Sequence, residues 1–405
     1  SALDNVLLKL LDKHVELLRI GPRAKVDPAL HPHLLSTIAA DLPPSADRVA
    51  ALRRALASRR VVAASSLALN DPLLAGRQFD VCIVDEAGQV TEPVCLGPVC
   101  AARRFVLVGD HYQLPPLVAA PQAERGGLAL SLFKRLAEAH PAAVCRLSAQ
   151  YRMTKDVMAV ANELVYAGHL RCGSAAVATA SLVLPFPERL PPRAAASAAA
   201  WAAAEKWVFD PKAGSVANGS VRTADWLRAV AAPERRVVFV DTDAMEAAEV
   251  RSDGVRGHVH NPAEAELVAR LAAALVGCGL PPSELALITP YNAQLKEIRK
   301  RLPETAAEAA ALSVDRCQGK DYGCVVLSMV RSNGQRKVGT LLADWRRLNV
   351  AFTRAKRKLV VVGSRKTLAE SPLLAAFGEL AAKKRWVVEL PPRANELYGE
   401  APAAP

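Results

Sequence analysis

Residues 79–89 read Phe79-Asp80-Val81-Cys82-Ile83-Val84-Asp85-Glu86-Ala87-Gly88-Gln89, an apolar run that ends in two adjacent carboxylates. A run this short, closed by acidic and then small residues, predicts a buried parallel strand whose end opens into a crevice. Open α/β sheets bind their ligands in such crevices. Asp85 there suits a magnesium ion on the phosphates of a nucleotide, and Glu86 suits a base that orients an attacking water. Taken alone, the pair is equally compatible with an acidic turn.

A second strand is predicted at Phe105-Val106-Leu107-Val108-Gly109-Asp110, before His111-Tyr112-Gln113-Leu114-Pro115-Pro116. Gly109 permits the close approach of another backbone segment, and the two prolines stiffen the exit from the strand. We therefore expect Asp110 and Gln113 to be held at a second strand end. Two neighbouring strands that both end in polar groups would form one site.

The composition narrows the class of protein. The chain has 405 residues, with 52 Lys and Arg against 40 Asp and Glu and a formal charge of +12, which favours a nucleic acid or a nucleotide as partner. The eight cysteines form no Cys-x-x-Cys pair, a pattern typical of reduced thiols rather than of disulfides or a metal cluster. No apolar stretch is long enough to span a bilayer, so we expect no membrane partner.

Buried strands alternate with helices in the second half of the chain, which predicts a doubly wound parallel sheet. The strands are too many for one such unit, so we expect an α/β protein with two domains, 1–125 and 126–390. The Pro-rich and Ala-rich region at about 174–236 is interpreted as a variable surface insertion without chemistry. Residues 391–405 are interpreted as a C-terminal tail.

Three further segments carry candidate residues. Arg152 follows a short apolar segment, Gly319 lies in a strand and tight turn predicted at 313–321, and Arg354 lies on a basic helix predicted at 344–356. A guanidinium group can neutralise charge on a transferring phosphoryl group. The alternative for Arg354 is an ordinary surface charge.

Residues 1–20 open with a predicted amphipathic helix. Its small polar start, from Ser1 to Asn5, could present N–H groups and the Asn5 side chain to a phosphate backbone. A plain helix cap is the alternative.

Together these segments resemble the motor of the superfamily 1 helicases, in the branch that includes the nonsense-mediated-decay RNA helicases. The motifs occur in the family's order: 1–5 looks like motif Ia, 85–88 like motif II, 109–116 like motif III, 150–153 like motif IV, 314–321 like motif V and 347–356 like motif VI. The resemblance implies two RecA-like domains, the first truncated at its N-terminus, that use ATP and Mg²⁺.

The resemblance also assigns roles to the candidate residues. Asp85 would bind magnesium, Glu86 would activate the attacking water, and Gln113 would sense the γ-phosphate. Arg152 and Arg354 would reach the γ-phosphate from the second domain. The cofactor-binding residues would further include Asp110 and Gly319, and the nucleic-acid contacts would be Ser1, Asn5, Pro290, Tyr291 and Gln294. Tyr291 could stack on a base or equally pack in the core.

Within this branch, Cys95-Leu96-Gly97-Pro98, 131–136, Cys172-Gly173-Ser174 and 344–349 are most similar to the replication helicase/nucleases that trim Okazaki-fragment flaps. This resemblance implies 5′-to-3′ unwinding, single-stranded and flap DNA as substrates, and replication or repair proteins as partners. It also implies a nuclear location, with a mitochondrial one in addition.

One departure from the family concerns the phosphate loop. The pattern Gly-x-x-x-x-Gly-Lys-Ser/Thr does not occur, and the flanks of the one Gly-Lys pair, Gly319-Lys320, do not fit it. The family's nuclease domain and iron–sulfur cysteines do not occur either, so a cluster would belong to a missing N-terminal part. We therefore expect the C-terminal part of a larger enzyme, inactive on ATP by itself.

Two other functions remain open at this point. An RNA helicase of the same branch carries nearly the same motor motifs. A nucleic-acid-binding module that does not hydrolyse ATP is compatible with the missing phosphate loop.

Overall fold

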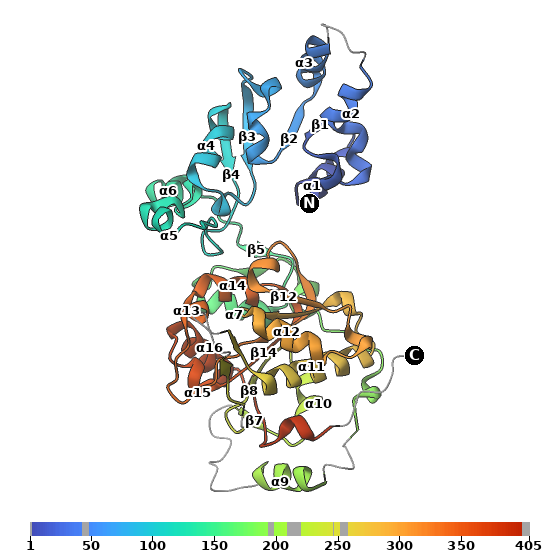
Figure 1. Cartoon of the computed structure of the whole chain (residues 1–405), viewed down its shortest axis with the longest axis vertical. Helices are drawn as coiled ribbons and strands as arrows, with labels where there is room; N and C mark the ends of the chain where they lie inside the picture. Colours follow the sequence, from blue (N-terminus) through green and yellow to red (C-terminus); the bar gives the residue numbers. More distant parts are fainter. Residues whose placement is uncertain are drawn as a thin grey trace. The chain divides into compact units, whose positions relative to one another are not determined.

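The computed structural model describes residues 2–42, 48–192, 198–208, 220–245, 247–251 and 258–398. The chain divides into two compact units, Ser1–Cys145 and Arg146–Pro405, and each is described by itself (Figure 1). The architecture is mixed α/β, and its largest sheet is a parallel one in the second unit.

Unit 1 contains two parallel strand pairs, β1 with β2 and β3 with β4. Leu17 of β1 packs with Leu7 of α1, whereas its neighbour Leu18 packs with Leu52 of α3. Because successive side chains of a strand point to opposite faces, helices cover both faces of this pair. The elements are α1 (Ala2–Leu11), β1 (Leu17–Ile20), α2 (Leu35–Ala40), α3 (Arg48–Ser58), β2 (Val61–Ala64), β3 (Phe79–Val84), α4 (Glu92–Cys100), β4 (Ala102–Leu107), α5 (Pro121–Ala123) and α6 (Leu132–Ala139).

The boundary between the units lies at Cys145/Arg146, later than the domain limit predicted at 125/126. The reason is α6, whose Leu132, Phe133 and Leu136 pack in one apolar cluster with Val84 and Ala87 at the end of β3. Ser131 fixes the start of α6, because its hydroxyl accepts the backbone N–H of Lys134 at 3.2 Å. The helix after the predicted limit is therefore part of unit 1.

Unit 2 is built on a seven-stranded parallel sheet in the order β12-β11-β13-β14-β8-β15-β7. Every neighbouring pair in this sheet is parallel. All amino ends of its strands therefore share one edge, here called the amino edge, and all carboxyl ends share the opposite carboxyl edge. The strands are β7 (Ser220–Arg222), β8 (Val237–Asp241), β11 (Leu285–Thr289), β12 (Ala310–Ser313), β13 (Tyr322–Ser328), β14 (Ala355–Gly363) and β15 (Val387–Glu389).

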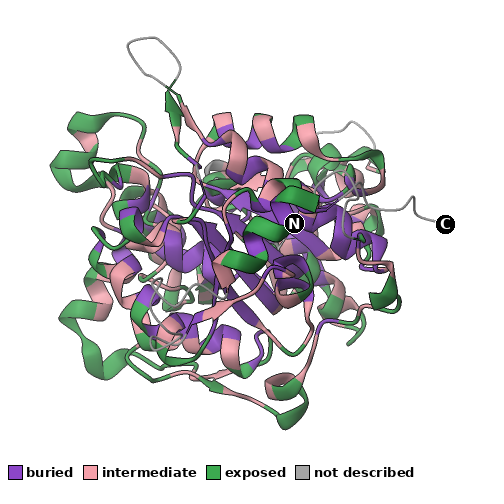
Figure 2. Cartoon of the chain, turned by 90° about the horizontal axis from the view of Figure 1, so that it is seen from below, coloured by how far each residue is buried: buried purple, intermediate pink, exposed green. Residues whose placement is uncertain are grey.

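Helices cover both faces of this sheet, as the apolar strands require. Val238 and Val240 of β8 pack in the cluster that contains α11 and α12. Phe239 points to the other face, where its ring centroid lies 5.4 Å from that of Phe377 in α16. The remaining elements are β5 (Ala149–Gln150), α7 (Lys155–Leu164), β6 (Arg171–Cys172), α8 (Ala175–Thr179), α9 (Ala198–Val208), α10 (Trp226–Ala231), β9 (Val250–Arg251), β10 (Val259–His260), α11 (Pro262–Gly277), α12 (Asn292–Arg301), α13 (Thr340–Ala343), α14 (Trp345–Phe352), α15 (Arg365–Leu368) and α16 (Pro372–Lys383). Figure 2 shows the buried residues gathered on the strands and on the inner faces of the helices.

The region predicted as a surface insertion and the predicted tail contribute to the core of unit 2. β7 is an edge strand of the large sheet, and the indole N–H groups of Trp201 and Trp226 donate to the carbonyls of Leu397 (2.6 Å) and Ala394 (3.1 Å). Tyr398 is also buried and donates its hydroxyl to Asp225 at 2.7 Å. The Pro-rich and Ala-rich composition of these segments therefore did not predict that two of their tryptophans bind the C-terminal residues.

Two predicted elements have different bounds in the structure. The helix predicted at 344–356 ends at Phe352, and β14 begins at Ala355. Thr353 marks this end, because its hydroxyl donates to the carbonyl of Asn349 at 2.8 Å and competes with the helical pattern. The strand predicted within 313–321 is replaced by a 3₁₀ turn at Val314–Arg316 and by Gly319 at φ 72°.

None of the helices in the described ranges combines the length and the apolar character that a membrane span requires.

Candidate functional site

The turn after β3 orients the two carboxylates that the sequence singled out. Asp85 and Glu86 are both exposed, and Glu86 has a left-handed backbone with φ 52°. Such a conformation in a residue other than glycine is uncommon and concentrates at functional sites. The Oδ1 atom of Asp85 accepts the backbone N–H of Glu86 at 3.0 Å, and Glu86 Oε2 accepts the amide of Gln89. One short turn therefore fixes both acidic groups.

Two glycines allow the loop after β4 to lie directly against this turn. A Cβ atom on Gly109 would lie 2.9 Å from the backbone nitrogen of Gly88, and a Cβ atom on Gly88 would lie 3.1 Å from the carbonyl oxygen of Asp110. The backbone N–H of Ala87 also donates to the carbonyl of Val108 at 2.8 Å. The prediction that Gly109 permits a close backbone approach is confirmed, and the two strand ends lie side by side.

The loop after β4 positions Gln113 through Asp110. The two carboxylate oxygens of Asp110 accept the amide of Gln113 at 3.1 Å and the backbone N–H of Tyr112 at 2.9 Å. These bonds hold Asp110 within its own loop and direct the Gln113 carboxamide. The cluster thus combines two exposed carboxylates with one oriented amide, a set that can hold a divalent cation and a water.

In unit 2, the turn before β13 brings together three predicted residues at the amino edge. Gly319 supplies the left-handed conformation of this turn. Arg152 Nε lies 3.3 Å from the carboxylate of Asp321, and both side chains are 41 % exposed. Arg354 donates to the carbonyl of Lys320 at 3.0 Å. The adjacent residues Lys320 and Asp321 therefore link the two arginines.

Arg354 is not an ordinary surface charge, because only 2 % of it is exposed. Its guanidinium donates to the carbonyls of Val350 and Lys320, both at 3.0 Å, and to the Thr353 hydroxyl at 3.2 Å. These bonds join the end of α14 to the Gly319 turn. In this arrangement Arg354 stabilises the turn.

A side-chain amide and a glycine shape the segment that carries Arg152. Gln150 Oε1 accepts the backbone N–H groups of Arg152 and Met153 at 2.8 and 2.7 Å. A Cβ atom on Gly173 would lie 2.2 Å from the ring of Tyr151, so a larger residue there would displace this ring. The sequence showed both segments but gave no signal that they meet.

Of the predicted nucleic-acid residues in unit 1, Asn5 is exposed on α1, whereas Ser1 lies outside the described residues. The neighbour of Asn5, Asp4, is buried and accepts from Arg19 Nε at 3.2 Å. This ion pair fixes α1 to β1 and so fixes the direction of the helix face that carries Asn5. Sequence reasoning had passed over Asp4.

Three predicted nucleic-acid residues follow β11 at the carboxyl edge, and one of them is buried. Gln294 has no exposed surface, and its amide bonds both the N–H and the carbonyl of Asn261 and the Ser328 hydroxyl. A direct nucleic-acid contact by Gln294 is therefore contradicted, because both ends of its amide are used inside the protein. Pro290 and Tyr291 are half-buried, and burial raises the pKa of the Tyr291 phenol.

A buried carboxylate that the sequence did not reveal supports the end of β13. Glu264 Oε1 accepts the Ser328 hydroxyl at 2.7 Å, and its two oxygens accept the Val330 N–H at 2.9 and 3.1 Å. Val330 has φ 70°, a strained conformation for a β-branched residue. Burial raises the pKa of Glu264 to about 7. From sequence, Glu264 was indistinguishable from a capping residue of the helix that Asn261 begins.

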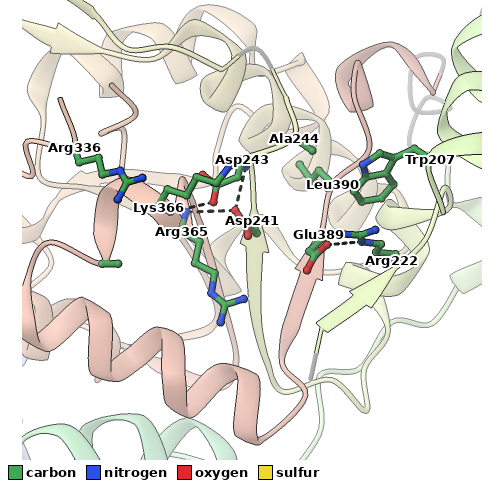
Figure 3. A pocket seen from close by; sticks show the side chains of 11 residues that line it. Trp207, Arg222, Asp241, Asp243, Ala244, Arg336, Arg365, Lys366, Glu389 and Leu390 are labelled. Atoms are coloured by element: carbon green, nitrogen blue, oxygen red, sulfur yellow. Dashed lines mark hydrogen bonds and ion pairs between the residues drawn. The ribbon is translucent and has the colours of Figure 1, made fainter. Parts of the chain in front are cut away.

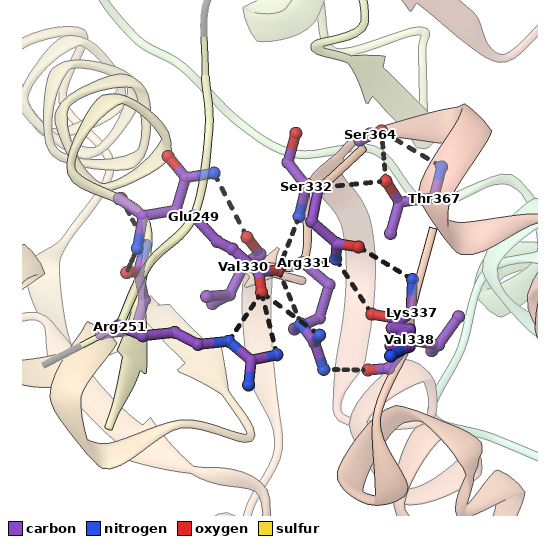
Figure 4. A network of polar contacts seen from close by, with 12 residues as sticks. Glu249, Arg251, Val330, Arg331, Ser332, Lys337, Val338, Ser364 and Thr367 are labelled. Carbon is purple, nitrogen blue, oxygen red and sulfur yellow. Dashed lines mark hydrogen bonds and ion pairs between the residues drawn. The ribbon is translucent and has the colours of Figure 1, made fainter. Parts of the chain in front are cut away.

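The adjacent ion pair between Glu249 and Arg331 is also buried (Figure 4). Arg331 Nε lies 2.7 Å from Glu249 Oε2, and the side chains are 4 and 6 % exposed. Asn333 also donates to this carboxylate at 2.9 Å. Burial alone would raise the pKa of Glu249, but the bonds from Arg331 and Asn333 hold it below its ordinary value. The network locks the loop after β13.

The cysteines and other potential ligands form no metal centre in the described ranges. All eight cysteines are free thiols. No group of three or more His, Cys, Asp or Glu side chains within these ranges has an arrangement suited to a metal ion. Asp85 therefore stays the predicted magnesium ligand, as a single carboxylate.

Two family models, both described as AAA domain, match residues 45–121 and 128–366. The chain is 39 % identical to the DNA replication ATP-dependent helicase/nuclease JHS1 of Arabidopsis thaliana, over 97 % of this chain and 26 % of the relative. It is 38 % identical to the DNA replication ATP-dependent helicase/nuclease DNA2 of Mus musculus, over 98 % of this chain and 35 % of that protein. The corresponding protein of Saccharomyces cerevisiae is 35 % identical, over 96 % of this chain and 24 % of that protein.

The chain thus spans about a quarter to a third of the length of these relatives. A solved structure, the arterivirus nonstructural protein 10 helicase with DNA, has a TM-score of 0.41 at 14 % identity, over 92 % of this chain and 54 % of that one, too distant to support any statement on the site. The resemblance to the replication helicase/nucleases is confirmed by the sequence relatives. Since one family model matches more than half of the residues, the chain belongs to the AAA domain family.

Proposed function

We propose that the chain forms the ATP-driven motor of a 5′-to-3′ DNA helicase that acts on single-stranded and flap DNA. The observation that carries the proposal is the paired turn after β3 and β4, where Gly88 and Gly109 let the turn that holds Asp85 and Glu86 lie against the loop that begins at Asp110. The names of the relatives, which are ATP-dependent helicase/nucleases, support the same activity. We further propose that the two units correspond to RecA-like domains.

The turn in unit 1 provides separate roles for its polar side chains. Asp85 would hold Mg²⁺, which neutralises phosphate charge, and its orientation by the Glu86 N–H suits this role. Glu86, exposed next to it, would orient and deprotonate the attacking water. Asp110 would keep the Gln113 amide directed towards the γ-phosphate of ATP. Each role uses a group whose direction is fixed by a bond to its own loop.

The amino edge of unit 2 provides the positive charge that phosphoryl transfer requires. Arg152, which is 41 % exposed, would stabilise the charge that develops on the γ-phosphoryl group. Arg354 is buried and donates to the carbonyls of Val350 and Lys320, so it would join Arg152 only after leaving these bonds. Their shared link through Lys320 and Asp321 supports a joint action. The Gly319 turn would carry the state of the nucleotide to the strand-binding surface.

For the nucleic acid we propose contacts from Asn5, Pro290 and Tyr291, and none from Gln294. Asn5 is exposed on α1, and the accessible part of the Tyr291 ring could stack on a base. The formal charge of +12 supports binding to a phosphate backbone. We propose replication and repair proteins as partners, in line with the names of the relatives. We also propose a nuclear location with a mitochondrial pool, which the family resemblance implies.

The test separates the two adjacent carboxylates in the full-length protein. Glu86→Gln should retain binding of ATP and Mg²⁺ while turnover falls, because it removes a base but little volume. Asp85→Asn should weaken the magnesium-dependent part of nucleotide binding. Matched controls are Glu138→Gln on α6 and Asp80→Asn on β3, which change exposed carboxylates of the same unit. Calorimetric binding and phosphate release report the two properties separately.

An equal loss of nucleotide binding in both variants would show that the two roles are misassigned. Turnover that no single-stranded DNA stimulates would contradict the motor function itself. Unwinding of RNA duplexes but not of DNA duplexes would contradict the choice of DNA.

A further inference from the structure

A cavity of about 530 Å³ lies at the carboxyl edge of unit 2, beside β8, β15 and β7 (Figure 3). It is separate from the amino edge with Arg152 and Arg354, and the sequence analysis assigned no function to it. Its volume is within the range of small-ligand sites, about 300–1,000 Å³. The charged and aromatic residues that line it are Trp207, Arg222, Asp241, Asp243, Arg336, Arg365, Lys366 and Glu389.

The carboxylates of this cavity are occupied by protein donors. Asp241 accepts the backbone N–H groups of Asp243 and Arg365 at 3.0 and 3.3 Å. Asp243 accepts the Ser364 hydroxyl at 2.7 Å and the Lys366 N–H at 3.0 Å. These acids therefore serve to shape the loops after β8 and β14.

The third carboxylate, Glu389, is bound in the same way. It accepts the Ser220 hydroxyl and lies 2.6 Å from Arg222 Nε. Burial also raises the pKa of Asp241 to about 7, which lowers the negative charge near neutral pH. The cavity thus presents less negative charge than its composition suggests.

The positive groups are directed differently. In Figure 3 the side chain of Arg365 points away from Asp241, although its backbone N–H bonds that carboxylate. Among the ion pairs of the described residues none joins Arg365 or Lys366 to these acids, although, against the effect of burial, Ser220, Arg222 and the charge of Arg365 together hold the pKa of Glu389 below its ordinary value. Arg336 is exposed and has only a long contact of 3.9 Å with Glu370. Three cationic side chains therefore remain available for an anionic ligand.

An aromatic ring lies beside these cations. Trp207 at the end of α9 is half-buried, and the guanidinium carbon of Arg222 lies 4.9 Å from its ring centroid. The electron-rich face of an indole attracts a cation, so the stacked arginine helps to orient the ring. An aromatic ring beside positive charge is the combination that binds single-stranded nucleic acid, in which phosphates meet cations and unpaired bases meet rings.

The loop that carries Arg336 is fixed before any ligand binds. The Asn333 amide donates to the Lys337 carbonyl at 3.0 Å and accepts the Lys337 N–H at 2.9 Å, which closes the loop. Arg331, held by Glu249, donates to the Val338 carbonyl at 2.7 Å. A preformed loop loses little conformational entropy on binding. Arg336 is therefore presented to the cavity at low entropic cost.

From these observations we propose that the cavity binds a segment of single-stranded DNA, with its phosphates at Arg336, Arg365 and Lys366 and an unpaired base at Trp207. This site extends the strand-binding surface of the carboxyl edge from Tyr291, after β11, to the opposite end of the sheet. The inference rests on the proposed DNA-dependent motor function. It adds a binding site that the motif positions do not contain.

Charge reversal tests the phosphate contacts. The double variant Arg336→Glu/Lys366→Glu should bind a labelled dT oligomer at least about tenfold more weakly, because two phosphate contacts become repulsive. The slope of log Kd against log salt should fall by about two. Lys383→Glu/Arg385→Glu is the matched control, since it makes the same charge change in exposed residues next to the amino end of β15. Fluorescence anisotropy measures both affinities.

Crosslinking tests the aromatic contact independently of stability. A dT oligomer with 5-iododeoxyuridine should crosslink to Trp207 of the unmodified protein, identified by mass spectrometry of the peptide. Trp207→Ala should weaken binding about 5- to 100-fold, the usual effect of one lost stacking contact.

The outcomes separate this inference from the proposed function. The inference alone would be overturned by three results together. The wild-type protein binds dT, the cavity variant and its control bind dT with equal affinity, and no crosslink forms at Trp207. Wild-type protein that binds no single-stranded DNA would overturn the proposed function as well. Dependence on the cavity only with an rU oligomer would overturn the choice of DNA.

Discussion

The two edges of the unit 2 sheet hold their charged residues in different ways. At the amino edge, Arg152 pairs with Asp321 half in solvent, and Arg354 bonds backbone carbonyls of the Gly319 turn. At the carboxyl edge, Glu264 and the Glu249–Arg331 pair are almost fully buried beneath exposed loops. The amino edge is thus built around one turn, which the bonds of Arg152 and Arg354 hold. The carboxyl edge is built around a rigid base that presents loops.

With the roles proposed above, the carboxyl ends of the strands are not a sufficient guide to function in this sheet. Ligands of open α/β sheets usually bind at the carboxyl ends of strands. In unit 1 that rule identified Asp85 and Gln113 after β3 and β4. In unit 2 the same rule leads to the cavity at Asp241, whereas Arg152 and Arg354 lie at the amino edge.

The largest effect is expected from breaking the buried pair at the carboxyl edge. Arg331→Met should lower the free energy of unfolding by about 3–5 kcal/mol, because it leaves the Glu249 carboxylate buried without its main partner. Denaturant unfolding followed by circular dichroism measures this loss. Arg393→Met, which removes an exposed arginine paired with Glu396, should leave the midpoint unchanged. Equal midpoints in both variants would show that the carboxyl edge has no rigid base.

The second effect concerns turnover at the amino edge. Loss of Arg152 or Arg354 by substitution with Ala should each reduce ATP turnover in the full-length protein by about a hundredfold or more. Because the two residues act in one state, the double variant should be little worse than the worse single one. Arg316→Ala, in the neighbouring exposed turn, is the control. A double-mutant cycle measures the coupling, and additive, few-fold losses would contradict a joint action of the two arginines on the γ-phosphoryl group.

The smallest effect is a pH dependence of stability from Glu264. Its pKa of about 7 in the folded chain exceeds the ordinary 4.5, so the folded state holds the proton more tightly. The stabilising contribution of Glu264 to the free energy of unfolding is therefore fully present below pH 4.5. It is lost as the pH rises through 7, and the loss is about 3 kcal/mol at most. Glu264→Gln should reduce the decline of stability between pH 5 and 8. The part of the decline that comes from Asp241, whose pKa is also raised to about 7, should remain. Parallel pH profiles of the unfolding midpoint in wild type and variant would contradict this account.

The sequence predicted the parallel sheet and the paired turn of unit 1 because both depend on local patterns. The apolar runs at β3 and β4 form parallel strands and Gly109 makes its expected close contact. The predicted burial of the first strand is wrong, because Val81 and Ile83 of β3 are exposed, and most of β4 is exposed as well. Contacts between distant segments had no such signal. The Trp226 bond to Ala394 and the position of Tyr151 against Gly173 depend on the tertiary packing of segments that look unrelated in sequence.

The candidate site shows the same difference between features with a local sequence pattern and features that depend on tertiary packing. Asp85, Glu86 and Gln113 were proposed from strand ends, whereas the family resemblance gave Arg152 and Arg354 their predicted role at the γ-phosphate. Gln294 was misassigned because motif position does not reveal burial, and the structure places its amide in the core. The carboxyl-edge cavity was missed because its residues come from six separate segments of the chain.

The most direct test of the division between the two edges is a titration of ATP turnover with single-stranded DNA in the full-length protein. One curve gives both the maximal turnover and the DNA concentration at half saturation. Arg152→Ala should lower the maximal turnover and leave the half-saturating DNA concentration unchanged. Arg336→Glu/Lys366→Glu should raise the half-saturating concentration about tenfold or more and leave the maximum unchanged. A shift of both parameters by both variants would contradict the account, because the two edges would then serve one function.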